Sequence, residues 1–207
     1  MNTTALTTLI IFAKAPVAGQ AKTRLMPALG AEGAAALAAR LLQHTVTTAL
    51  SAGFGAVELC VAPDAAHLAF AELAAQHPAL HWAVQGEGDL GARMHRAFQR
   101  RLAGGQPVLL VGTDAPALDA EMLRAAAHAL TDQDAVFVPA LDGGYALIGL
   151  RRPEASLFDG MPWSTARVMP ESRERARRAG LRWAELPAVP DIDEPADLQH
   201  VPAGWLA

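Results

Sequence analysis

The sequence predicts an α/β fold with a mixed, mostly parallel sheet and helices on both of its faces. Short apolar runs alternate with segments of helical periodicity along almost the whole chain, as in sheets built from parallel strands and crossover helices. The run at 108–111, Val-Leu-Leu-Val, has no polar residue, as expected of a central strand covered on both faces. The runs at 136–139 and 145–150 are too close for a crossover helix, so these two strands are predicted to be antiparallel.

The individual elements follow from periodicity and from turn residues. The first apolar run predicts a buried strand over 6–13, and helical spacing predicts a helix over 32–50, which ends before Gly53. Asp89 is expected to cap a further helix, whose last turns carry arginines that suit the negative end of the helix dipole. The other strands are expected at 56–62, 80–85, 107–111, 134–139, 145–150 and 181–186, and the other helices at 65–76, 121–130 and 173–179.

Composition limits the class of protein. With 207 residues, of which 52% are hydrophobic and 18% charged, the chain is expected to fold as one domain over 1–207. A net charge of −4 argues against a nucleic-acid partner, which requires a basic face. The single cysteine, Cys60, excludes an internal disulfide and lies in an apolar run, so we expect it to be buried.

The sequence predicts no membrane span, because no run reaches the about 18 consecutive apolar residues that a span requires. A short apolar run at 9–13 lacks the basic segment that precedes the apolar part of a secretory signal. A cytoplasmic location is therefore expected.

Ligands of such sheets bind outside the carboxyl ends of the strands, and this rule selects the loops that matter. The first is Gly/Pro-containing, holds Lys14, Gly19, Lys22 and Arg24, and includes the only two lysines among 17 basic side chains. Backbone N–H groups and cationic side chains in a loop between a strand and a helix suit a phosphate chain. The alternative is a solvated basic loop. The other selected loops are 86–91, 112–118, 141–144 and 190–195.

A G-x-G-x-x-G pattern at 86–91 follows the third predicted strand. The pattern is typical of dinucleotide binding, but Glu87 and Asp89 would place carboxylates against the pyrophosphate, which disfavours an NAD-dependent oxidoreductase. A second interpretation is a glycine-lined wall beside a nucleotide base, formed by Gly86 and Gly91, with the amide of Gln85 on the base edge. A third is a helix start capped by Asp89.

Two acidic loops suggest a divalent cation. Asp114 directly follows the central apolar strand, where its carboxylate could bind Mg²⁺ or Mn²⁺ that bridges to phosphates, or could cap a turn before Pro116. In the segment 190–195, alternation in an extended chain sends Asp191 and Asp193 to the same face, where they could hold a cation or form an exposed acidic turn.

An acceptor pocket is predicted from two further segments. Asp142, Gly143, Gly144 and Tyr145 form a turn that contains the only tyrosine, and Trp163 precedes a Ser/Thr-rich helix start. The alternative for both is a turn with a partly buried aromatic side chain.

The order of these motifs resembles a known family. The segments are F-A-K-x-P-x-x-G-x-x-K-T-R-L, Q-G-x-G-x-L-G-x-R-M, G-x-D-x-P-x-L, D-G-G-Y-x-L-I-G-L, W-S-T and D-I-D-x-P-x-D-L. Together they resemble bacterial GT-A-fold transferases associated with arsenosugar biosynthesis or with radical-SAM/selenodomain proteins. That family is similar to 2-phospholactate guanylyltransferases and molybdenum-cofactor nucleotidyltransferases.

The resemblance implies a three-layer α/β/α GT-A fold and a role for each motif. Lys14, Gly19, Lys22 and Arg24 would bind nucleotide phosphates, and Gln85 and Gly91 would meet the base. Asp114 would ligate the metal, and Asp193, rather than Asp191, would complete the metal site. The first loop lacks the compact G-x-G-x-R-x-x-x-K form of many sugar nucleotidyltransferases.

These observations predict a transferase that uses a nucleotide, a small-molecule acceptor and Mg²⁺ or Mn²⁺. The first hypothesis is a glycosyltransferase with a nucleotide-diphospho-sugar donor, in which the metal stabilises the leaving diphosphate. The second is a nucleotidyltransferase, in which Lys22 and Arg24 offset the charge of a triphosphate while Asp114 holds the metal. A third is a noncatalytic nucleotide-binding protein.

Overall fold

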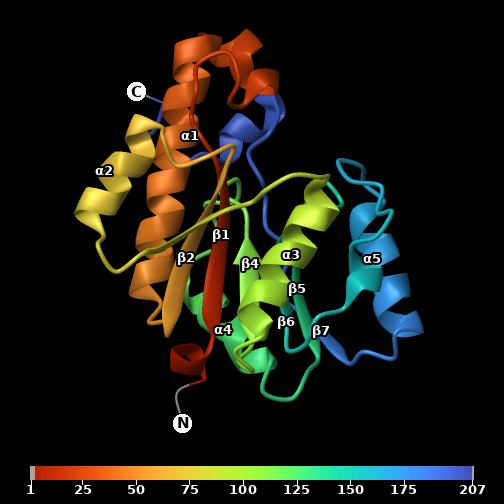
Figure 1. Cartoon of the computed structure of the whole chain (residues 1–207). Helices are drawn as coiled ribbons and strands as arrows, with labels where there is room; N and C mark the ends of the chain where they lie inside the picture. The colour runs from red at the N-terminus through yellow and green to blue at the C-terminus, as the bar shows by residue number, and fades with distance from the viewer. Residues whose placement is uncertain (1–2, 207) are drawn as a thin grey trace.

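A computed structural model describes residues 3–206 of the chain. Within this range seven strands form one sheet in the order β3-β2-β1-β4-β6-β5-β7 (Figure 1). The strands are β1 (Thr8–Lys14), β2 (Ala56–Ala62), β3 (His81–Val84), β4 (Val108–Val111), β5 (Ala135–Pro139), β6 (Tyr145–Leu150) and β7 (Trp183–Glu185). β6 is antiparallel to β4 and to β5, and the other neighbouring strands are parallel. The predicted α/β class and the antiparallel insertion are confirmed.

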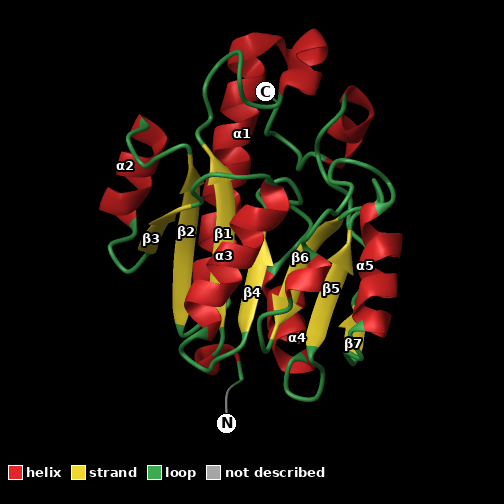
Figure 2. Cartoon of the chain, turned by 45° about the vertical axis from the view of Figure 1, so that its right-hand side comes forward, coloured by secondary structure: helices red, strands yellow, loops and turns green. Residues whose placement is uncertain are grey.

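Helices cover both faces of the sheet (Figure 2). Apolar side chains of α1, α2 and α4 form one core layer with side chains such as Leu9 of β1, and those of α3 and α5 form the other with side chains such as Ile10. Successive residues of β1 thus point to opposite faces, and both faces are buried. The helices are α1 (Met26–Ser51), α2 (Leu68–Gln76), α3 (Leu90–Leu102), α4 (Ala120–Ala129) and α5 (Val168–Arg178), with 3-10 turns η1 (Thr4–Leu6), η2 (Thr23–Leu25), η3 (Ala155–Leu157) and η4 (Pro195–His200).

Several predicted boundaries differ from the structure, among them the start of α2, which is Leu68 rather than 65. Three others have a local cause. β1 begins at Thr8 rather than at 6, because residues 4–6 form η1. α1 begins at Met26 rather than at 32, but Gly30, with φ of 71° and ψ of 171°, is not helical and kinks it. The long part of α1 begins after this kink, close to the predicted start. α5 begins at Val168 rather than at 173, because Pro170 lies in its first turn, where the missing N–H of proline costs no hydrogen bond.

The segment Thr23–Ser51, which contains α1, is long and apolar enough to cross a membrane by length and composition, with a mean hydropathy of 1.3. A core helix of a soluble protein passes the same test. Buried residues of α1, such as Leu42 and Val46, pack against the sheet here. The absence of a membrane span therefore stays a prediction.

Three of the loops selected by the carboxyl-edge rule meet in space. The amide of Ile192 donates to the carbonyl oxygen of Asp114 at 2.8 Å, and the segment after β7 also forms a bridge between Val189 and Ala140. The loops that follow β4, β5 and β7 are thereby held side by side. Cys60 is buried in β2, as expected, and its burial together with the charge of Glu58 raises its thiol pKa to about 11.

Candidate active site

The side chain of Lys22 joins two acidic loops that are far apart in the sequence. Its Nζ forms ion pairs with Oδ1 of Asp114 and, at 2.8 Å, with Oδ1 of Asp193, and it donates to the carbonyl oxygen of Ile192 at 2.5 Å. The two residues expected to bind the metal, and one expected to bind phosphate, thus form one cluster.

Backbone conformation aims Lys22 at this cluster. Lys22 immediately precedes η2 and has left-handed φ and ψ of 48° and 45°. Its side chain is only 8% exposed, whereas those of Asp114 and Asp193 are 47% and 43% exposed. The ammonium is therefore covered, and each carboxylate keeps a side toward solvent.

Two opposing effects set the pKa of Lys22. Burial lowers the pKa, and the charges of Asp114 and Asp193 raise it. The two carboxylates prevail, so the pKa of Lys22 lies above its ordinary value. Lys22 is a cation at neutral pH.

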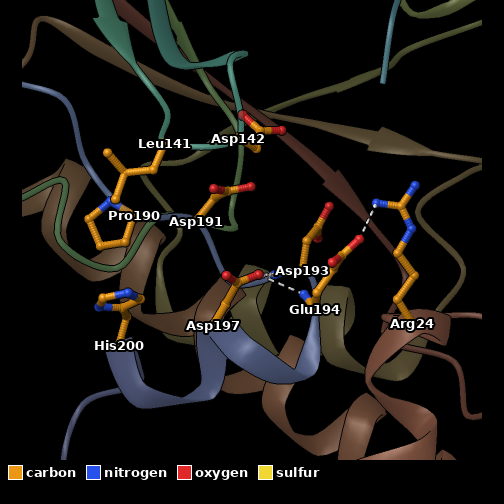
Figure 3. A pocket seen from close by; sticks show the side chains of 9 residues that line it. All are labelled: Arg24, Leu141, Asp142, Pro190, Asp191, Asp193, Glu194, Asp197 and His200. Carbon is orange, nitrogen blue, oxygen red and sulfur yellow. Dashed lines mark hydrogen bonds and ion pairs between the residues drawn. The ribbon is translucent and has the colours of Figure 1, made fainter. Parts of the chain in front are cut away.

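A cavity of about 280 Å³ adjoins the cluster (Figure 3). Asp191 and Asp193 both line it, and Ile192 between them is fully buried beneath, which confirms the predicted alternation. Asp142 reaches the same hollow from the turn between β5 and β6. The lining residues are Arg24, Leu141, Asp142, Pro190, Asp191, Asp193, Glu194, Asp197 and His200.

The surroundings of Asp191 in this cavity shift its pKa. Burial, followed by the negative charge of Asp142, raises the pKa of Asp191 to about 6. An ordinary aspartate in an unfolded chain titrates near 3.9. Folding therefore favours the protonated form of Asp191.

Asp191→Asn is expected to raise the melting temperature at pH 8 more than at pH 4. The carboxyl group contributes stability while it is protonated in the fold, and this contribution is lost as the pH rises through about 6. Asparagine avoids that cost. Thermal melts in the presence of a chelator measure the difference, and a difference that does not change with pH would contradict the assignment.

The glycine-rich loop after β3 is held by arginines of α3. Arg96 donates to the carbonyl oxygens of Gln85 and Glu87 at 2.6 and 2.8 Å, and Arg93 donates to that of Gly88 at 2.8 Å. Asp89 caps α3 by accepting from the amide of Ala92, as predicted. Because this carboxylate occupies the helix N-terminus, it also stands where a pyrophosphate would bind.

Gln85 and Gly91 have structural contacts that the sequence did not suggest. The side-chain nitrogen Nε2 of Gln85 donates to the carbonyl oxygens of Ala13 and Cys60, at 3.2 and 3.1 Å. A Cβ on Gly91 would lie 2.5 Å from the carbonyl oxygen of Phe158 and 2.9 Å from Nε1 of Trp163. A Cβ on Gly86 would lie 2.7 Å from Arg96. Contacts of these three residues with a base remain a prediction.

The predicted acceptor residues separate into two groups. Asp142 lines the cavity, and its Oδ1 accepts from the amide of Gly144. Gly143 packs on the backbone of Ala166, which leaves no room for a Cβ. Tyr145 and Trp163 instead pack in the core beneath α3 and α5, edge to face, with ring centroids 6.3 Å apart.

Tyr145 and Trp163 each bury a polar atom. Among the described residues the Tyr145 hydroxyl and the Trp163 Nε1 have no hydrogen-bond partner. Burial raises the pKa of Tyr145, so its hydroxyl stays protonated. Their role in acceptor binding remains a prediction.

The other predicted phosphate-binding residues of the first loop are exposed. Lys14, at the end of β1, and Gly19, with φ of 78°, are exposed. Arg24 lines the cavity and lies 3.7 Å from a carboxylate oxygen of Glu194. These positions are open to a phosphate chain.

The donor set at Lys22 fits a magnesium-type ion. Within residues 3–206, no group of three or more His, Cys, Asp and Glu side chains could hold a metal ion. Mg²⁺, however, is commonly bound by one or two carboxylates, with water and substrate phosphates in its other positions. Asp114 and Asp193 both reach one cation, the ammonium of Lys22, and both are half exposed.

Three polar residues of the cavity lining have no predicted role. Glu194 caps η4 in a capping box with Asp197. Pro195 at the first position of η4 is the local signal for this start. His200 lies at the end of η4, and no motif marks it.

Comparison with known proteins gives the family. The family described as an uncharacterized protein conserved in bacteria (DUF2064) matches residues 45–165, which is more than half of the chain. The chain belongs to the DUF2064 family. Lys22 and Asp193 lie outside the region that this DUF2064 match covers, and Asp114 lies inside it.

Relatives of this DUF2064 protein are transferases that act with nucleotides. A phosphoenolpyruvate guanylyltransferase of Chloroflexus aurantiacus is 30% identical over 188 residues, 87% of each chain. A crystal structure from Desulfovibrio desulfuricans G20, described as that of a candidate nucleotide-diphospho-sugar transferase, is 32% identical. Its TM-score is 0.86, over 97% of this chain and 90% of that one. A nucleotidyl transferase from Methanothermobacter, 21% identical over 97% of both chains, has a TM-score of 0.62 and supports the GT-A-like fold.

Proposed function

We propose that the protein is a nucleotidyltransferase, which joins a nucleoside monophosphate unit from a triphosphate to a small-molecule acceptor and releases pyrophosphate. The observation that carries this proposal is the relationship to a guanylyltransferase along 87% of both chains. The sequence alone favoured the glycosyltransferase, whereas this relative supports the nucleotidyltransferase hypothesis.

Each site residue has a role in this reaction. Asp114 and Asp193 would hold Mg²⁺ or Mn²⁺, which neutralises phosphate charge as a Lewis acid when it is bound. Lys14, Lys22 and Arg24 would bind the phosphates, because charge-assisted donors stabilise the charge that moves onto the leaving pyrophosphate. The arsenosugar association of the similar family stays a prediction.

The negative charge of the cavity bears on which acceptor the protein binds. Five carboxylates line the cavity, against the side chains of Arg24 and His200. An acceptor with phosphate and carboxylate groups, such as the phosphoenolpyruvate of the relative, would be repelled unless cations neutralise this wall. Phosphoenolpyruvate is therefore tested beside neutral hydroxyl compounds.

Pyrophosphate release decides between the two transferases. The protein is incubated with Mg²⁺, each of the four ribonucleoside triphosphates, and either phosphoenolpyruvate or a neutral hydroxyl acceptor. We expect acceptor-dependent pyrophosphate, with GTP as the first candidate.

A glycosyltransferase remains the second candidate, because the relative from Desulfovibrio is described as a nucleotide-diphospho-sugar transferase. It would release a nucleoside diphosphate from a nucleotide sugar, and this result without pyrophosphate formation would overturn the proposal. Tight nucleotide binding without either reaction would favour the noncatalytic alternative.

A further inference from the structure

The ammonium of Lys22 has no donor left for a ligand. It donates hydrogen bonds to Asp193 Oδ1 and to the carbonyl oxygen of Ile192, and it forms an ion pair with Asp114 Oδ1, so three oxygen atoms surround its three N–H groups. A phosphate oxygen could bind Lys22 only if at least one of these contacts broke. In this conformation Lys22 is a counter-ion of the site rather than a ligand-binding group.

The acceptors are held in place independently of Lys22. The hydrogen bond from the Ile192 amide to the Asp114 carbonyl ties the two acidic loops together, and Ile192 is buried in the core beneath α1. The amide of Asp193 donates to Asp197, which belongs to the capping box of η4. The two carboxylates would therefore stay close together if Lys22 moved away.

The carboxylates of Asp114 and Asp193 can bind only one cation in the position between them. An ammonium and a divalent ion in direct contact with the same two oxygens would repel each other strongly. We propose that Lys22 is the resident cation of this pair, and that it moves to the nucleotide phosphates when a divalent ion takes its place. This inference rests on the proposed function, because it requires a metal and a polyphosphate.

The exchange couples the two ligands through charge. Lys22 and the two carboxylates carry a net charge of −1, which gives a phosphate chain no attraction. With a divalent ion added, the same cluster carries +1, and the released ammonium has free donors. Metal and nucleotide should therefore strengthen each other, by the same factor in both directions.

Lys22→Met should thus have effects of opposite sign on the two ligands. Mn²⁺ alone should bind about tenfold more tightly, because no internal cation competes for the carboxylates, and tenfold corresponds to about 1.4 kcal/mol. In the presence of Mn²⁺, GTP should bind at least tenfold more weakly, because its phosphates lose the ammonium. Calorimetry and the electron paramagnetic resonance signal of free Mn²⁺ measure both affinities.

Lys14→Met is the matched control, since it removes the other lysine of the same exposed loop without touching the acidic pair. We expect its affinity for Mn²⁺ alone to equal that of the wild type. Lys22→Gln serves as a second variant, and circular dichroism melts show which of the two is folded.

The outcomes separate the inference from the proposed function. If a folded Lys22 variant binds Mn²⁺ alone no more tightly than the wild type, the proposed exchange is wrong. It is also wrong if Lys14→Met gains as much affinity for Mn²⁺ as the Lys22 variant does. If the wild type binds no triphosphate in the presence of Mn²⁺, the proposed function fails. The measurement with Mn²⁺ alone then still decides whether Lys22 holds the cation position.

Discussion

Asp114→Asn is expected to lower the rate of pyrophosphate release by about 10²- to 10³-fold, the loss that follows removal of one group that stabilises charge in a transition state. Asp114 is a proposed metal ligand and a partner of Lys22. Asparagine keeps the shape of the side chain but removes its charge. The Asp114 side chain is 47% exposed, and Asp193 remains as a partner of the Lys22 ammonium, so the variant should stay folded, which thermal melts check.

Asp119→Asn is the matched control for this substitution. Asp119 lies in the same connection, before α4, and its Oδ1 accepts from the amide of Met122 at 2.8 Å. Asparagine caps helices as well as aspartate, so turnover and stability should not change. Equal losses of turnover in the two variants would mean that the connection, rather than the Asp114 carboxylate, supports the reaction.

The order of elements and the edge that carries the site could be predicted, because both depend on local patterns. Apolar runs and helical spacing located each strand and each α-helix. The rule on carboxyl edges selected the loops after β1, β4, β5 and β7, which the structure brings together, and also the loop 86–91, which packs against α3. The sequence alternation around Ile192 correctly predicted that the side chains of Asp191 and Asp193 share one face. Because the Ile192 side chain is buried, both aspartates point the other way and line the cavity. The starts of α1 and α5 were harder to predict, because proline and glycine near the start of a helix are compatible with several start positions.

The contacts of Lys22 could not be predicted from the sequence. A basic loop at a strand end predicts phosphate binding, and nothing local shows that a left-handed residue turns this side chain toward a segment about 170 residues later. The G-x-G-x-x-G pattern has the same limitation. Gly91 matches the last glycine of the dinucleotide-binding pattern. In the structure, however, its missing side chain leaves room for Phe158 and Trp163. A glycine required by tertiary packing and one required by a ligand look alike in a sequence.

A buried glutamate and two partly exposed arginines form an ion cluster outside the candidate site. The side chain of Glu58, on β2, is 2% exposed, and it is bound by Arg100 and Arg101 from the end of α3. One of its oxygens accepts from Nε of Arg101 at 2.7 Å, and the other accepts from Arg100. A cavity of about 380 Å³ lies beside this cluster, at the edge of the sheet.

Glu58→Gln is expected to lower the free energy of unfolding by about 3 kcal/mol, the cost at which one partner is removed from a buried ion pair. In a chain of this length that corresponds to a fall in melting temperature of about 6–12 °C. Glutamine fills the same space, but its amide nitrogen would face two guanidinium groups, which donate only. Glu174→Gln is the control, because Glu174 pairs with two arginines on an exposed face of α5, where water replaces lost contacts. Thermal melts at neutral pH compare the two variants, and equal shifts would show that burial adds nothing to the Glu58 cluster.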